Sequence, residues 1–257
     1  MSSVINTNVR SMFASAALET NERQMSVAMN QLSTGKRTYS ASVDAAGLAL
    51  ADKLTSQIRG TQMAVRNIND GISYLQTAEG ALNEITSMGQ RMYELSIQQT
   101  NSDTLSTEQL ASITTELTDL AAGIDEIIAN TKWNGVATAD FSATITTSGD
   151  GTAVVFAATT TLGTTPDGTD SADILTFLDE VASQRGEAGS AINRLAYMAD
   201  NLSNLAANLS ASRSRTMDTD YASASAELAR TQIIQQAATA MLAQANQSSQ
   251  SVLSLLK

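Results

Sequence analysis

The chain has 257 residues, no cysteine, no histidine and a formal net charge of −11 at pH 7. Without cysteine there are no disulfides, thiolate metal sites or cysteine nucleophiles, and without histidine the commonest general base and metal ligand are missing. The acidic balance has the wrong sign for nucleic acid or anionic lipid. We therefore expect no enzymatic activity, no cofactor, no metal, and neither nucleic acid nor a membrane as partner.

The composition favours helices. Aromatic residues make up only 4% of the chain and Pro166 is its single proline, while Ala, Leu, Ile and Met supply most of the apolar content. Few residues can interrupt a helix, and few bulky rings can fill a thick globular core. The N-terminal residues lack the basic start and apolar stretch of a cleaved signal, so we expect any export to proceed without one.

Residues 4–130 have the apolar spacing of long helices. Ile68, Leu75 and Leu82 recur every seven residues, and a second run follows a polar stretch at 99–103. The second run alternates spacings of three and four residues and consists of Leu110, Ile113, Leu117, Leu120, Ile124 and Ile127. With Ser106 available as an N-cap, these patterns predict two antiparallel helices joined by a short polar loop.

The middle of the chain changes character after Asn134-Gly135, a dipeptide typical of turns. Residues 138–176 contain no Lys or Arg, and two β-prone runs at 139–147 and 152–161 flank the polar residues 148–151. This arrangement predicts a small β-hairpin.

The helical pattern returns at Ala172. Val181, Ala188 and Leu195 again recur every seven residues, and residues 231–256 contain no charge at all. Several Gln and Asn residues in that stretch are incompatible with a bilayer core, so the C-terminal stretch must be buried against protein. The fold class is therefore mainly α: a long antiparallel helical hairpin or coiled-coil bundle with paired terminal helices and a small β-hairpin in the middle.

The two terminal helices carry apolar stripes that are too narrow to offset the entropy of ordering them alone. We therefore expect them to order when many copies pack together. The expected self-assembly interface consists of Val9, Met12, Leu18, Met25, Leu32, Ile233, Met241, Val252, Leu253, Leu255 and Leu256.

Short motifs at both ends of the chain resemble bacterial flagellin, in colinear order over about residues 1–137 and 177–257. The N-terminal motifs are INTNV (5–9), LSTGKR (32–37), DAAGLA (44–49), QIRG (57–60), RNINDGI (66–72) and QTAEGAL (76–82). The C-terminal motifs are NRL (193–195), SRSR (212–215), DYA (220–222), QQA (235–237), AQANQ (243–247) and VLSLL (252–256). Where the family usually has proline in the tail, this chain has Ser249, which predicts that the last helix continues.

The resemblance implies a subunit of the helical bacterial flagellar filament used for swimming. Such a subunit is exported unfolded by the flagellar type III system and polymerised at the filament tip, so it is secreted and extracellular. The resemblance places residues 1–44 and 217–257 in an inner coiled-coil layer and residues 45–137 and 172–216 in a helical rod layer. Residues 138–171 then form an outward-facing hairpin in place of a large outer domain.

The implied partners are further copies of the chain, the filament cap and hook-associated proteins, and an export chaperone on the C-terminal helix. The resemblance also implies contact of Arg91, Leu95 and Glu116 with the animal innate immune receptor for flagellin. Because Tyr93 replaces a usual arginine beside them, the hypothesis is weak or variable sensing. Some flagellins carry O-linked sugar on the exposed middle segment, where Thr144, Thr146 and Ser148 are the candidates.

Two other classes of function stay open from the sequence. A hook-filament junction protein has chain ends similar to those of flagellin, and seeded growth of long filaments distinguishes the two. An enzyme or a membrane-active helix is disfavoured, because the chain has no histidine and residues 231–256 have no Lys or Arg. The acidic cluster at 167–173 lacks the spacing of a calcium loop and fits a turn before a helix better.

Overall fold

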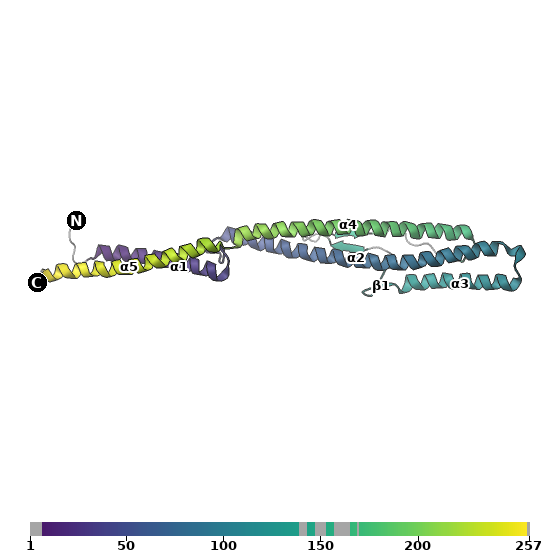
Figure 1. Ribbon diagram of the computed structural model, residues 1–257, viewed down its shortest axis with the longest axis horizontal. Coiled ribbons are helices and arrows are strands. Elements are labelled where there is room, and N and C mark those ends of the chain that lie inside the picture. Colours follow the sequence, from purple (N-terminus) through teal and green to yellow (C-terminus); the bar gives the residue numbers. More distant parts are fainter. Residues whose placement is uncertain (1–6, 139–142, 147–152, 157–164, 169, 256–257) are drawn as a thin grey trace. The chain divides into compact units, whose positions relative to one another are not determined.

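The computed structural model describes residues 7–138, 143–146, 153–156, 165–168 and 170–255. These residues form five α-helices, a short 3-10 turn and two small antiparallel sheets (Figure 1). The helices are α1 (Val9–Thr34), α2 (Ala45–Thr100), α3 (Thr107–Asn130), α4 (Ser171–Met217) and α5 (Tyr221–Leu255). The prediction of a mainly helical chain with a small central β-hairpin is confirmed.

The chain divides into two compact units. We call Met1–Thr55 together with Leu209–Lys257 the terminal unit, and Ser56–Asn208 the central unit. Each is built around its own helix pairing.

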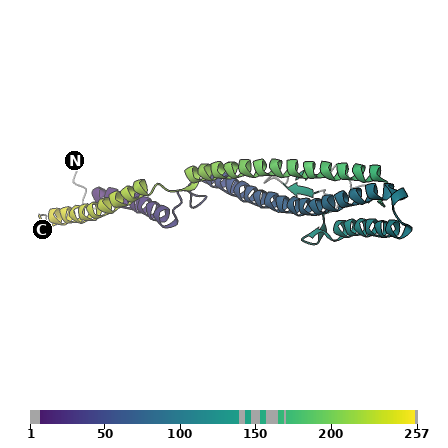
Figure 2. The same cartoon turned by 45° about the vertical axis from the view of Figure 1, so that its right-hand side comes forward.

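In the central unit, α2 runs antiparallel to both α3 and α4 and lies between them in both views (Figures 1 and 2). The predicted sevenfold spacings lie in its core, where Ile68, Leu75 and Leu82 of α2 and Val181 and Leu195 of α4 are buried. Buried side chains of all three helices form one apolar cluster, which comprises Ala78, Leu82, Ile85, Met92, Leu95, Ile113, Leu117, Ile124, Ile174, Phe177 and Val181.

Helix α3 begins where the sequence predicts. The Ser106 side chain accepts a hydrogen bond from the backbone N–H of Gln109 at 3.3 Å. In return the Gln109 side chain accepts one from the backbone N–H of Ser106 at 2.9 Å. This capping box satisfies two backbone donors at the helix start and fixes the end of the α2–α3 connection.

Two hairpins lie between α3 and α4. Strands β3 (Ala143–Thr146) and β4 (Ala153–Phe156) pair in antiparallel register and confirm the expected hairpin, although the remainder of both β-prone runs lies outside the described residues. The predicted Asn134-Gly135 turn joins a second hairpin that the sequence pattern did not predict, formed by β1 (Lys132–Trp133) and β2 (Val136–Ala137). The two turn residues have φ of 50° and 80°, the left-handed region in which Asn and Gly are favoured.

In the terminal unit, α1 and α5 run antiparallel. The end of α1 and the α4–α5 connection meet beside each other: the Arg37 backbone N–H donates to the Met217 carbonyl at 2.7 Å, and the Thr219 backbone N–H donates to the Gly35 carbonyl at 3.0 Å. Gly35 caps α1 with φ of 69°, a conformation that costs any residue with a Cβ about 1 to 2 kcal/mol. Beyond this joint α5 continues through Ser249, as predicted.

No helix among the described residues is long and apolar enough to cross a membrane.

Candidate self-assembly surface

Helices α1 and α5 pair along a regular seam of alternating three- and four-residue spacings. The least exposed positions of α1 include Ser11, Ala14, Leu18, Asn21, Met25, Ala28 and Leu32. Those of α5 include Ala224, Leu228, Thr231, Gln235, Ala238, Leu242 and Ala245. This spacing is that of a coiled coil, but most of these side chains are small or polar.

Small side chains let the two helices approach closely. Cα atoms of α1 and α5 repeatedly come within 8 Å of each other, a closeness that α2, α3 and α4 reach at most sporadically among themselves. Larger side chains, such as Leu82, Phe177 and Ile124, keep the helices of the central unit farther apart. The terminal pairing therefore buries little apolar surface for its length.

Asparagine side chains supply directed contacts across the seam. Asn21, which is buried, donates from Nδ2 to the Thr231 carbonyl at 2.8 Å. Asn8 donates from Nδ2 to the Ala245 carbonyl at 3.1 Å and also caps the start of α1. These two hydrogen bonds fix one register between the helices, because a shift along the seam would break both.

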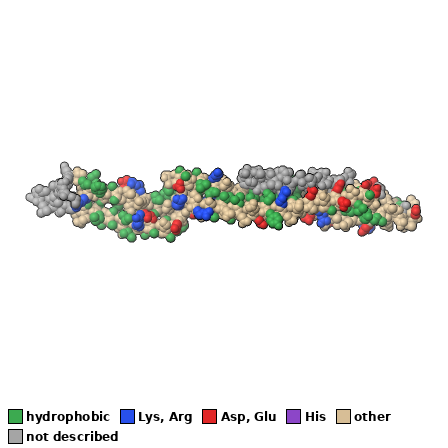
Figure 3. Space-filling view, turned by 90° about the horizontal axis from the view of Figure 1, so that it is seen from above, with side chains coloured by type: hydrophobic (Ala, Val, Ile, Leu, Met, Phe, Trp, Pro, Cys, Tyr) green, Lys and Arg blue, Asp and Glu red, His purple; other side chains and the backbone are tan. Residues whose placement is uncertain are grey.

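Several large apolar side chains of the terminal helices lie outside the seam and are exposed. Phe13, Ile233 and Met241 have 73%, 67% and 65% of their surface exposed. We call the exposed set the outward apolar surface; it consists of Val9, Met12, Phe13, Val27 and Met29 on α1 and Ile233, Ile234 and Met241 on α5. Figure 3 shows green hydrophobic side chains spread over the surface of these helices. Exposed apolar side chains that form a contiguous patch mark interaction sites, so this set is the candidate assembly surface.

The residues expected at a self-assembly interface fall into three groups. Val9, Met12, Ile233 and Met241 lie on the outward apolar surface. Leu18, Met25 and Leu32 are half-buried in the seam within the chain. The remaining four are at the end of the chain: Val252, Leu253 and Leu255 are in α5, with side chains outside the described part, and Leu256 lies outside the described residues.

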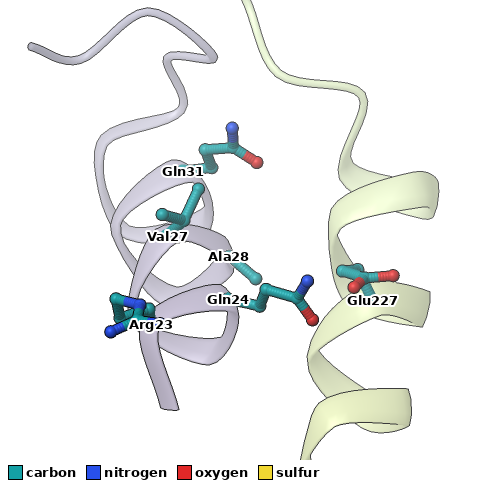
Figure 4. Close-up of a pocket in the computed structure, with 6 residues that line it drawn as sticks. All are labelled: Arg23, Gln24, Val27, Ala28, Gln31 and Glu227. Carbon is teal, nitrogen blue, oxygen red and sulfur yellow. The ribbon is translucent and has the colours of Figure 1, made fainter. Parts of the chain in front are cut away.

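A shallow groove runs between α1 and α5 near the joint (Figure 4). Its lining residues are Arg23, Gln24, Val27, Ala28, Gln31 and Glu227. The Glu227 carboxylate accepts hydrogen bonds from Arg230 Nη2 at 2.6 Å and Nε at 3.1 Å. These hydrogen bonds, and to a smaller extent the charge of Arg230, lower the pKa of Glu227 against the opposing effect of desolvation. The lining of the groove therefore combines two apolar side chains, Val27 and Ala28, with polar and charged ones.

In the central unit, two of the three candidate receptor residues pair with each other. Arg91 donates to the Glu116 carboxylate at 2.9 Å and to Glu94 at 3.2 Å, and its hydrogen bond to Glu116 is the main reason why the pKa of Arg91 is raised. Leu95 is only 2% exposed and belongs to the apolar core. The candidate glycosylation residues Thr144 and Thr146 lie in β3, whereas Ser148 lies outside the described residues.

Sequence reasoning missed part of this surface. Phe13, Met29 and Ile234 are exposed but lie off the predicted stripes, and Asn21 is buried although the prediction did not include it. The available signal was the sevenfold spacing of Leu18, Met25 and Leu32 with Asn21 and Ala28, which marks the seam. That spacing predicts which face pairs within the chain and thus which face is left over.

Comparison with known proteins gives one consistent family. Residues 5–144 match the bacterial flagellin N-terminal helical region, and residues 172–256 match the bacterial flagellin C-terminal helical region. The chain is 38% identical to a flagellin of Halalkalibacterium halodurans over 99% of this chain and 100% of that protein. It is 35% identical to a flagellin of Bacillus subtilis over 98% and 99% of the two chains.

One more sequence relative and one solved structure are also similar. A flagellar filament 33 kDa core protein of Treponema phagedenis is 36% identical over 99% of this chain and 100% of that protein. The crystal structure of Bacillus cereus flagellin matches 56% of this chain and 88% of that chain, with a TM-score of 0.40 and 23% identity.

Proposed function

The chain belongs to the bacterial flagellin family, and from this membership we propose that it is secreted and polymerises outside the cell into the filament that drives swimming. Members of this family are structural filament proteins and not enzymes. A helical filament grows by repeated head-to-tail contact, so each subunit needs a surface that stays open until a neighbour arrives. The outward apolar surface of α1 and α5 is the observation that carries the proposal.

The proposed layers follow the family plan. Residues 1–44 and 217–257 form the inner coiled-coil layer, and residues 45–137 and 172–216 form the rod layer. Residues 138–171 face outward. In support, α1 and α5 pair with each other, and both chain connections at this boundary meet at the Lys36–Asp218 bridge. An inner layer also surrounds apolar side chains such as Ile233 with neighbouring subunits, which removes them from water.

Other partners follow from the same membership. We propose export through the flagellar type III system with a chaperone on α5, and polymerisation under the filament cap next to the hook-associated proteins. The absence of charge in residues 231–256 supports a chaperone site on α5, since a bound chaperone would shield this segment from water before assembly. For the immune receptor, Arg91 and Glu116 offer an exposed pair, while buried Leu95 supports the rod surface from beneath. O-linked sugar on Thr144, Thr146 or Ser148 remains a prediction.

A filament subunit is favoured over a hook-filament junction protein. The cited relatives that span almost the whole chain carry the names flagellin or flagellar filament core protein. A junction protein forms only a short segment between hook and filament, whereas a filament subunit continues to polymerise on its own copies. Growth on filament seeds therefore separates the two functions.

The test is seeded polymerisation of the purified chain, followed by electron microscopy. We expect the wild-type chain to extend seeds into filaments many subunits long, and Ile233→Glu to slow elongation at least tenfold because a charge then enters an apolar contact. Gln232→Glu is the matched control, since it adds the same charge at the neighbouring exposed position of α5. We expect it to elongate within about twofold of wild type.

Three outcomes decide the matter. Wild-type chains that fail to extend any seed contradict the filament proposal. Extension that stops after one short layer indicates the junction function instead. Equal loss in both variants means that negative charge on α5, and not the outward apolar surface, limits growth.

A further inference from the structure

Methionine contributes strongly to the outward apolar surface. Met12, Met29 and Met241 are 62%, 54% and 65% exposed. Because the chain has no cysteine, its methionines are its only sulfur-containing side chains. Their exposure contrasts with that of Met92, which lies in the core of the central unit at 0%.

Exposed thioethers react with peroxides. The sulfur takes one oxygen atom as the peroxide O–O bond breaks, an S=O bond forms, and the other oxygen leaves as water or alcohol. The product, methionine sulfoxide, is polar and chiral, and dedicated reductases convert it back to methionine. Oxidation therefore turns an apolar contact side chain into a hydrogen-bond acceptor that an apolar interface cannot satisfy.

We propose that Met12, Met29 and Met241 are a peroxide-sensitive modification site that controls assembly: in the free subunit their oxidation blocks addition to the filament. The inference rests on the proposed function, because it requires these side chains to become buried by neighbouring subunits. The two helices of the seam hold all three in one unit, so a single oxidant exposure modifies several contacts at once.

The exposure of these three side chains predicts that free subunits are more sensitive to peroxide than assembled filament. Oxidation reaches the three thioethers while the subunit is free, and neighbouring subunits shield them once it is incorporated. Existing filament is then resistant to peroxide while new growth is sensitive. Reduction of the sulfoxides restores growth competence without new synthesis.

The first measurement is site-resolved oxidation. Purified free subunits are treated with hydrogen peroxide and digested with trypsin, which separates Met12, Met241 and Met92 into different peptides. We expect Met12, Met29 and Met241 to oxidise at least tenfold faster than Met92. We also expect the three to be protected at least tenfold in assembled filaments.

The second measurement is seeded elongation of treated subunits. We expect at least a tenfold loss for the wild-type chain, reversed by a methionine sulfoxide reductase. The triple variant M12L/M29L/M241L keeps apolar side chains of similar volume and should elongate equally before and after peroxide. M63L is the matched control, because Met63 is 47% exposed in the central unit and its loss should leave the sensitivity unchanged.

Several results would overturn the inference. One is full elongation of wild-type chains in which all three sulfoxides are present. Another is equal peroxide sensitivity of the triple variant and the wild type, and a third is loss of sensitivity in M63L. Untreated chains that never elongate are a separate result, because they refute the proposed function itself and the inference with it.

Discussion

Asn21 is a buried polar side chain in the seam of the terminal unit. Its residue is 4% exposed, its Nδ2 donates to the Thr231 carbonyl, and its Oδ1 has no hydrogen-bond partner among the described residues. A buried amide with one unsatisfied atom costs stability that an apolar residue would not. Its compensating role is to specify register, the best attested use of a single polar residue in a coiled-coil seam.

Asn21→Asp should destabilise the pairing of α1 and α5 by about 3 kcal/mol or more, because a charge replaces the amide donor in a buried position. The measurement is loss of helical circular dichroism with temperature. Asn30→Asp is the matched control, since Asn30 is exposed on the same helix. We expect the control to stay within about 0.5 kcal/mol of wild type. Equal effects of the two changes would show that Asn21 has no special role.

The Glu227–Arg230 pair gives α5 one pH-dependent contact. The hydrogen bonds from Arg230 lower the pKa of Glu227 in the folded chain, so the ionised form is favoured there. The stabilisation is present above the ordinary pKa of glutamate and is lost as the pH falls through the lowered value. Arg230→Gln should raise the pKa of Glu227 towards its ordinary value, measured by NMR titration of the carboxyl carbon. An unchanged titration would contradict the role of Arg230 in lowering the pKa of Glu227. Arg215→Gln is the control, because it removes a different arginine and should leave the titration of Glu227 unchanged.

At the scale of single elements, the start of α3 offers a sharp test. Ser106→Ala removes one half of the capping box and should cost the central unit about 1 kcal/mol. Ser112→Ala, an exposed position inside the same helix, should be neutral or slightly stabilising because alanine is the better helix former. Urea unfolding of the two variants measures the difference, and equal midpoints would contradict the role of the cap.

Element positions could largely be predicted from sequence, because apolar spacing records which side of a helix is buried. The core positions of α2 and α3 follow from such spacing, and the cap at Ser106 follows from the preference of serine for that position. The hairpin of β1 and β2 could not be predicted beyond its turn, since its strands have only two residues each. Tyr74 of α2 packs against this hairpin through an edge-to-face contact with Trp133, with ring centroids 6.2 Å apart. No local sequence pattern predicts that contact.

The assembly surface was harder to predict for a physical reason. In an ordinary amphipathic helix the largest apolar side chains mark the buried face. Here Ile233 and Met241 are exposed while Ala224 and Thr231 are buried. A prediction based on hydrophobicity alone therefore cannot separate the intrachain seam from the outward apolar surface. It assigns Leu18, which lies in the seam, and Met12, which lies on the outward apolar surface, to the same interface.

At the scale of the whole molecule, the two units differ in how much apolar surface they bury. The central unit has two apolar clusters rich in Leu and Ile side chains, whereas the seam of the terminal unit consists mostly of small or polar residues with two asparagine contacts. Burial of apolar surface is the main stabilising contribution to a fold. The terminal helices should therefore open far more often than the central ones in a free subunit.

Hydrogen–deuterium exchange tests this difference directly. In dilute subunits, amides of α1 and α5 should exchange at least a hundredfold faster than buried core amides near Leu82 and Ile124. In assembled filaments the two sets should become similar. Equal protection of both units in the free chain would refute the claim that terminal order depends on neighbouring subunits.

The pairing of α1 with α5 also sets a time order on biosynthesis. Asn8 finds its hydrogen-bond partner 237 positions later in the chain, so a ribosome must deliver nearly all of the described polypeptide before α1 can meet the helix it pairs with. Until then the beginning of the nascent chain has no intramolecular seam to join. The topology thus delays folding of the termini until after translation, while the polypeptide can still be threaded as an open strand.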